Sequence, residues 1–489
     1  MNAVLKATLI LGSSSLVSVG LGLLTTVFWA VLLGPEGMGY LGLLQSFVLL
    51  GGLLISLGSG NAVIRFGAMA FAQADHARYQ AVRLAGWGLG ALGSLGLLVL
   101  LVVLGGPIGS WMIGPAEPRT TLYWLWAVIT LNLAYAILTG LLNAQHQVKI
   151  LAKISLFTRL LVALAGIAAI SWWLAAGIIP SLVAGGIASW LVPWFYYRQA
   201  NQSRRVPVPL PQVRAAAGDL LRFGVPCAAS QLVGTGVQWI IPSVVLQMLD
   251  QASVGFFRPA MMVSTMCLGM VLTAMAQDYF PRLSAVHQDA AAMVRLVNEQ
   301  NYLALLLGLP MIALVLSLGP ILIPLLLTRK FAPVMTILQW QMMGDVLKFS
   351  SWALGFVLLA RNRSVQYFAV EAIGGMVLLA TTCLGLRYFR LEGLGLAYLA
   401  SYLVYFLAVW WVCRQEIQMV WTSANRRLIL LALGTVLLLR GAEWIPHFGW
   451  RTTFKMAVAG LVTGLCAWLL NKKYALAGWI RHRLASVKS

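Results

Sequence analysis

The chain has 489 residues, of which 60% are hydrophobic and only 10% charged, and its mean hydropathy is +0.86. This composition excludes a soluble globular protein and predicts an all-α polytopic membrane protein. The net charge of +21 raises the question of nucleic acid. The basic residues, however, are scattered between apolar stretches, so a nucleic-acid partner is excluded.

The apolar stretches predict the membrane spans. At about 20 apolar residues per crossing, we expect fourteen spans, the thirteenth being short. The first apolar run, 7–33, is too long for a signal peptide and is expected to stay as the first span. The expected spans are 7–33, 40–58, 84–105, 122–143, 156–176, 178–197, 223–249, 254–276, 301–319, 335–360, 366–386, 394–413, 428–441 and 453–470.

The lysines and arginines predict the orientation. With the N-terminus inside, most of them fall on the inner segments, which places both termini in the cytoplasm. Residues 198–219, with the run RRVPVPLP, are expected to form an extended cytoplasmic linker. No outer loop is long enough to fold as a domain, which disfavours a membrane glycosyltransferase or polymerase.

Two similar segments indicate an internal repeat. Residues 33–40 and 249–256 share one pattern: a leucine, five variable residues, a glycine and an aromatic residue. The two segments are about 216 positions apart in the chain. The same offset brings Arg65 within one position of Arg282, so two matches support one repeat. We therefore expect two six-helix lobes related by a pseudo-two-fold axis along the membrane normal, with a substrate path between them. The expected domains are an N-terminal lobe, 1–210, a C-terminal lobe, 211–415, and an extra helix pair with a basic cytoplasmic tail, 416–489.

The span 335–360 carries an acid and a base three residues apart. Asp345 and Lys348 would share one face of a helix and could neutralise each other. A charge at mid-membrane costs about 2.5 to 3.5 kcal/mol on insertion scales, so neither should face lipid. In one interpretation, the two residues form a structural pair that fixes the span to a neighbouring helix. In the other, they line a transport cavity, where Lys348 attracts phosphate and Asp345 adjusts the charge of Lys348 or takes up a proton.

Other polar residues inside the spans are weaker candidates. Glu371 either pairs near the cytoplasmic end of its span or acts in gating. Stripes of small and amide residues either hold helices together or line a common wet interior. Each arginine alone suits an anchor at the membrane surface, but together they would form a cationic path for an anion. The stripes are Gln231, Thr235 and Gln238; Asn132, Thr139 and Asn143; and Ser14, Ser18 and Thr25; the cations are Arg258 and Lys330 towards the outside and Arg65, Arg159, Arg222 and Arg282 towards the inside.

No motif for covalent chemistry is present. The sequence contains no P-loop, HExxH or GxSxG, and its five cysteines and five histidines have no metal-ligand spacing. We expect neither an enzyme active site nor a metal site.

The stretch 330–406 reads FAPVMTILQWQMMGDVLK, GFVLLARNRSVQYFAVE and LAYLASYLVYF in succession. It resembles the Wzx-type flippases for lipid-linked oligosaccharides, above all the O-antigen and enterobacterial-common-antigen translocases, in the polysaccharide-transporter branch of the MATE-like superfamily. The segments LGPEGMGYLGL and FPRLS are similar to the same family, so the resemblance covers about residues 1–415.

The resemblance implies that an undecaprenyl-pyrophosphate-linked glycan passes from the cytoplasmic to the periplasmic leaflet of the bacterial inner membrane by alternating access. It also implies a cationic central cavity, no cofactor beyond a coupling ion (H+ or Na+) or the membrane potential, and a polysaccharide polymerase and chain-length machinery as partners, besides membrane lipid.

Two alternatives stay open. Typical members have twelve spans, and 423–489 adds two, which leaves room for a lipid II flippase. A MATE-type cation-coupled exporter is less favoured, because the span 7–33 has no carboxylate and the basic excess suits an anionic substrate.

Overall fold

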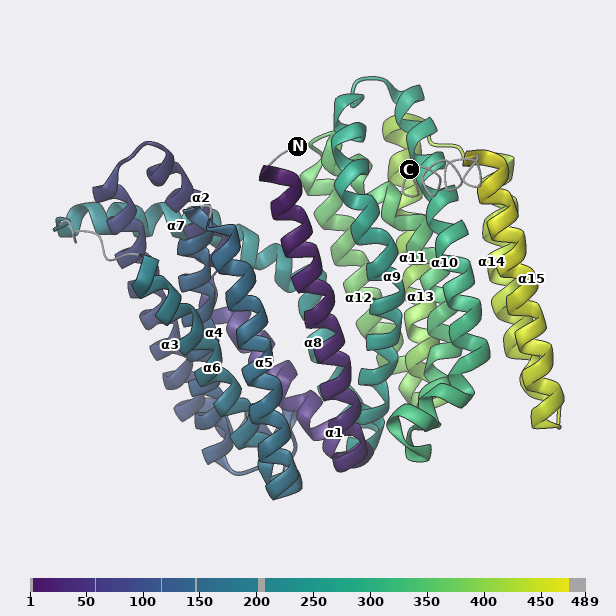
Figure 1. The fold of residues 1–489 in the computed structure, drawn as a ribbon, viewed down its shortest axis with the longest axis horizontal. Helices are drawn as coiled ribbons and strands as arrows, with labels where there is room; N and C mark the ends of the chain where they lie inside the picture. Colours follow the sequence, from purple (N-terminus) through teal and green to yellow (C-terminus); the bar gives the residue numbers. More distant parts are fainter. Residues whose placement is uncertain (1–2, 58, 116, 146, 201–206, 475–489) are drawn as a thin grey trace, which may run out of the picture. The chain divides into compact units, whose positions relative to one another are not determined.

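The computed structural model describes residues 3–57, 59–115, 117–145, 147–200 and 207–474. In these ranges the chain is helical, without a β-strand (Figure 1). The α-helices are α1 (Ala3–Ser56), α2 (Ser59–Ala72), α3 (His76–Met112), α4 (Arg119–Ala144), α5 (Val148–Trp173), α6 (Ile178–Ala200), α7 (Leu210–Gln231), α8 (Val237–Met248), α9 (Gln251–Ala285), α10 (Ala290–Leu327), α11 (Val334–Ala360), α12 (Ser364–Phe389), α13 (Glu392–Ile417), α14 (Ser423–Gly441) and α15 (Phe448–Tyr474).

Each predicted span overlaps at least one of these helices, and 223–249 overlaps both α7 and α8, so the all-α polytopic membrane fold is confirmed. Within the described ranges, nine helical stretches are long and apolar enough to cross a membrane. Two of them, Gly20–Ser56 and Lys149–Gln199, each hold two predicted spans. In the first, the chain bends at Gly34, whose backbone φ of 65° is open to glycine and costly for other residues.

The region between α6 and α7 differs from the prediction. We expected an extended linker over 198–219, but α6 continues to Ala200 and α7 begins at Leu210. Pro209 has an extended backbone just before the helix, and Pro211 lies in its first turn, where the missing N–H has no partner to lose. The prolines that suggested a linker therefore start a helix, while 201–206 lie outside the described residues.

The chain divides into two compact units, Met1–Gly255 and Phe256–Ser489. In the first unit, α4 packs on α2, α3 and α6, while α5 packs on α1 and α6. The predicted lobes and domain boundaries follow the internal repeat rather than compactness, and they stay a prediction.

The two repeat-related segments cross each other closely. A Cβ atom on Gly39 would overlap the carbonyl oxygen of Gln251, and a Cβ on Gly255 would overlap the carbonyl oxygen of Pro35. The two contacts are equivalent, because Gln251 lies four positions before Gly255 and Pro35 lies four positions before Gly39. This equivalence agrees with the repeat. The close approach of the two backbones makes glycine necessary at both positions.

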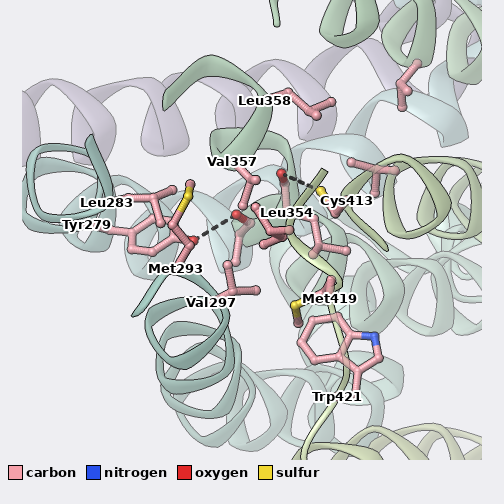
Figure 2. Packing of buried hydrophobic residues seen from close by; sticks show 14 residues of the cluster. Tyr279, Leu283, Met293, Val297, Leu354, Val357, Leu358, Cys413, Met419 and Trp421 are labelled. Carbon is pink, nitrogen blue, oxygen red and sulfur yellow. Dashed lines mark hydrogen bonds between the residues drawn. The ribbon is translucent and has the colours of Figure 1, made fainter. Parts of the chain in front are cut away.

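In the second unit, α13 packs along both α11 and α12, and α10 contacts α11, α14 and α15. One end of this unit has an apolar core that includes Leu283, Val297, Val357 and Met419 (Figure 2). The Tyr279 hydroxyl donates to the carbonyl of Ala353 at 2.9 Å, so this buried polar group is paired. The core packs against the C-terminal half of α11, the helix that also carries the predicted acid and base.

Candidate functional site

The Asp345 side chain lies at the centre of a polar cluster in the second unit. This residue is 1% exposed, and its Oδ1 accepts hydrogen bonds from the Ser264 hydroxyl at 2.9 Å and the Tyr398 hydroxyl at 2.7 Å. Its Oδ2 is buried without a hydrogen-bond partner. A buried carboxylate oxygen without a donor is costly, because it has lost its hydration and gained no hydrogen bond in exchange.

Lys348 reaches the same cluster through Tyr398 rather than through Asp345. Its Nζ donates to the Tyr398 hydroxyl at 3.4 Å and lies 5.0 Å from the centroid of the Tyr402 ring. The acid and the base do not form a direct ion pair, because the Tyr398 hydroxyl joins them, accepting from Lys348 and donating to Asp345. The positive charge of Lys348 is therefore not neutralised by a direct ion pair.

The aromatic rings extend this cluster along α13. The Tyr398 and Tyr402 ring centroids are 4.6 Å apart, and those of Tyr402 and Tyr405 are 6.1 Å apart. The Tyr405 hydroxyl donates to Glu371 at 2.7 Å. Three tyrosines on one helix face thus connect Asp345, Lys348 and Glu371, which come from α11 and α12.

Two glycines make room for the tyrosines. A Cβ on Gly344 would lie 2.6 Å from Tyr398 Cδ1, and a Cβ on Gly374 would lie 2.9 Å from Tyr405 Cδ2. The sequence contained a signal for these tyrosines, the i, i+4, i+7 spacing in LAYLASYLVYF, which places them on one face. The three tyrosines are not among the predicted site residues, because a tyrosine in an apolar span is ordinarily a packing residue.

Arg258 is on α9, the helix that also supplies Ser264. It is partly buried and makes no hydrogen bond or ion pair within the described part of the chain. On α11, Gln341 stands one turn before Asp345; it donates to the Met261 sulfur at 3.0 Å, and its Oε1 is buried without a partner. Within the described residues, α9 therefore carries a cation without an ion-pair partner, and α11 carries a second buried oxygen without a hydrogen-bond partner.

The other predicted site residues do not join it. Arg282 is exposed and pairs with Asp278 at 3.0 Å, and Arg65 is exposed and lies 4.6 Å from the Phe223 ring centroid. The remaining candidates belong to the first unit, which holds no comparable cluster among its described residues. There Arg159, Arg222 and Gln231 are exposed, and Asn132 and Gln238 are half-buried.

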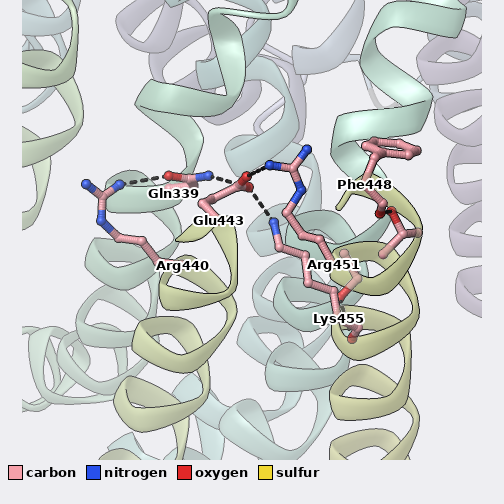
Figure 3. Close-up of polar contacts among 8 residues, drawn as sticks. Gln339, Arg440, Glu443, Phe448, Arg451 and Lys455 are labelled. Atoms are coloured by element: carbon pink, nitrogen blue, oxygen red, sulfur yellow. Dashed lines mark hydrogen bonds and ion pairs between the residues drawn. The ribbon is translucent and has the colours of Figure 1, made fainter. Parts of the chain in front are cut away.

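A second polar network ties α14 and α15 to α11 and α13 (Figure 3). Glu443 accepts from Lys455 at 2.5 Å, from Arg451 at 3.0 Å and from Gln339 at 3.0 Å. Arg440 donates to Gln339 at 2.7 Å. This network could not be recognised from the sequence, since Arg440 lies at the end of the predicted span 428–441 and Glu443 lies just beyond it, where both resemble ordinary loop charges.

Arg440 also reaches α13. It pairs with Glu392 at 2.5 Å and lies 4.0 Å from the Trp340 ring centroid, while the Trp340 indole donates to Glu392 at 2.6 Å. The C-terminal helix pair is therefore fixed to the bundle that carries the Asp345 cluster.

Among the described residues, no group of three or more His, Cys, Asp or Glu side chains could hold a metal ion. The Asp345, Tyr398 and Lys348 cluster contains a carboxyl group that can take up a proton and an ammonium group that can attract an anion.

Comparisons with known proteins agree with this description. The chain is 24% identical over 428 residues to the lipid III flippases of Escherichia coli (strain K12) and Shigella flexneri, covering 82% of this chain and 96% of each relative.

Solved structures share the fold. The lipid II flippase MurJ in an inward closed conformation superposes with a TM-score of 0.74 at 14% identity, covering 95% of this chain and 99% of MurJ. An inward-facing multidrug resistance MATE family transporter of the MOP superfamily gives 0.69 at 15% identity, covering 84% and 96%.

The profile described as "Polysaccharide biosynthesis protein" matches residues 28–336, which is more than half of the chain. The multi-pass helical fold and the similarity to flippases agree with this family. The chain belongs to the polysaccharide biosynthesis protein family.

Proposed function

We propose that this protein is a flippase that moves an undecaprenyl-pyrophosphate-linked oligosaccharide, an O-antigen or related repeat unit, from the cytoplasmic to the periplasmic leaflet by alternating access. The observation that carries the proposal is the match to the lipid III flippases over 96% of their length. A substrate that is a lipid-linked glycan precursor agrees with the family and with the cationic composition of the chain.

The chemistry of the cluster supports an anionic substrate. A pyrophosphate carries about two negative charges and needs positive partners when it loses water. Lys348 and Arg258 come from α11 and α9, and neither forms an ion pair with a described carboxylate. They are the cations that we assign to the pyrophosphate, and the polyprenyl tail stays in lipid.

Asp345 links this charge to a coupling ion. While Asp345 is ionised, Tyr398 donates to it and the negative charge attracts Lys348. A proton or Na+ at the unpaired Oδ2 removes that attraction and leaves Lys348 to the pyrophosphate. Binding of the coupling ion and binding of the substrate would then favour each other.

A lipid II flippase is the second candidate. The likeness to MurJ covers 95% of this chain, which must include part of α14 and α15, whereas the likeness to the MATE transporter covers 84%. A MATE-type exporter of cations is less supported, because the large excess of basic residues in the chain suits an anionic substrate better.

Removal of the gene product in its own host tests the proposal. We expect lipid-linked repeat units to accumulate on the inner leaflet while peptidoglycan synthesis continues, and wild-type protein to restore polysaccharide at the surface. Accumulation of lipid II with arrest of peptidoglycan would favour the second candidate. Normal amounts of both intermediates would contradict both flippase assignments.

A further inference from the structure

The second unit holds a pocket of about 420 Å³ that the Asp345 cluster does not use. It lies between α10, the start of α14 with the residues just before it, and the end of α15. Its wall includes Arg295, Glu299 and Tyr302 from α10, Trp421 before α14, and Lys473 from α15.

The charges on this wall are both positive and negative. Arg295 and Glu299 are four residues apart on α10 and both exposed, yet they form no ion pair within 4.0 Å. Lys473 Nζ lies 4.3 Å from the Tyr302 ring centroid. The pocket thus offers two cations, one carboxylate and two aromatic rings.

The floor of the pocket is fixed by buried amides. Asn298 donates to the Val420 carbonyl at 3.0 Å and accepts from the Thr422 backbone N–H at 2.9 Å. Asn425 donates to the Asn298 carbonyl at 2.9 Å. Trp421 lines the wall, is 8% exposed, and has a buried indole Nε1 without an acceptor. The pocket wall formed by α10 and the start of α14 is therefore preorganised.

We propose that this pocket binds the headgroup of an aminophospholipid, a phosphate joined to a primary ammonium. Arg295 and Lys473 take the phosphate by charge-assisted hydrogen bonds. Glu299, which is exposed and forms no ion pair with Arg295, takes the ammonium. Basic residues and aromatic rings at helix ends are typical of the headgroup region of a bilayer. Such a lipid would brace the end of α15 against α10.

Native mass spectrometry of the full-length protein, incubated with phosphatidylethanolamine or phosphatidylglycerol, tests this site. We expect wild-type protein to retain more phosphatidylethanolamine, and Arg295→Gln to lower retention of both lipids about tenfold, the equivalent of 1.4 kcal/mol. Glu299→Gln should abolish the preference for phosphatidylethanolamine and keep phosphatidylglycerol. Arg282→Gln is the matched control, because that arginine is also exposed but pairs with Asp278 outside the pocket.

Unchanged retention in Arg295→Gln, or equal retention of the two lipids by wild-type protein, would overturn the proposal. Displacement of the lipid by inorganic phosphate alone would also overturn it, because the pocket would then be a site for a soluble anion. Arg295→Lys should restore retention, which separates a lost contact from a misfolded protein.

Discussion

At the residue scale, substitutions in the Asp345, Tyr398 and Lys348 cluster distinguish a structural role of these residues from a role in transport. Lys348→Ala should leave the protein inserted but stop transport, because the pyrophosphate loses a cation. The double change Asp345→Asn with Lys348→Met removes both charges together, so it should recover stability but not transport. Membrane abundance and accumulation of lipid-linked intermediates report the two properties. A stable, active double variant would remove these residues from the mechanism.

Tyr398→Phe tests the bridge itself. The change removes the hydroxyl that donates to Asp345 and accepts from Lys348, and keeps the ring that packs on Gly344. We expect a loss of about 0.6 to 2 kcal/mol in stability, the range for hydrogen bonds between membrane helices, and a clear loss of transport. Tyr388→Phe is the control, because Tyr388 is exposed on α12. Equal transport by the two variants would show that the bridge is not needed.

The sequence predicted Asp345 and Lys348 as important because a charge inside an apolar span is rare. It could not predict that Tyr398, 53 residues after Asp345, would stand between them, since this depends on how α13 packs along α11. The predicted arginine path stays a prediction. Helix periodicity places a residue on a face but does not say which helix meets that face.

At the element scale, the crossing of α1 and α9 depends on two glycines. Gly39→Ala and Gly255→Ala each place a methyl group on a backbone carbonyl of the other helix, so the helices must separate. Both variants should lower membrane abundance and transport, whereas Gly52→Ala on α1, which has open space, should change neither. Detergent-solubilised yield and thermal unfolding measure the effect. Wild-type behaviour of both variants would argue against this tight crossing.

The C-terminal helix pair should depend on Glu443. Lys455 is 2% exposed and pairs with this carboxylate, so Glu443→Gln leaves a buried cation without compensation. Removing one partner of a buried pair costs about 3 to 5 kcal/mol, which should show as a lower unfolding temperature. The control Asp278→Asn breaks an exposed pair on α9 and should have little effect. Similar unfolding temperatures for the two variants would mean that the network does not hold α15.

The span positions were the part of the fold that the sequence predicted well, because a run of about 20 apolar residues has few alternatives to a membrane helix. Boundaries near proline were less certain: Pro209 and Pro211 suggested a linker and instead begin α7.

At the scale of the whole molecule, the basic residues predict that both termini are cytoplasmic. Single cysteines introduced at Gln202 and Ser489, in a background without native cysteines, should resist a membrane-impermeant thiol reagent in intact cells and react after permeabilisation. Labelling from outside at either position would reverse the predicted orientation.

The central claim is transport of a lipid-linked glycan, and purified protein in proteoliposomes tests it most directly. The measured quantity is the fraction of an undecaprenyl-pyrophosphate-linked oligosaccharide that becomes accessible to an impermeant glycan-modifying enzyme on the other leaflet. Our account predicts that wild-type protein raises this fraction well above that of empty vesicles and that Lys348→Ala does not. Equal fractions for wild-type protein and empty vesicles, with a coupling-ion gradient and a membrane potential applied, would contradict it.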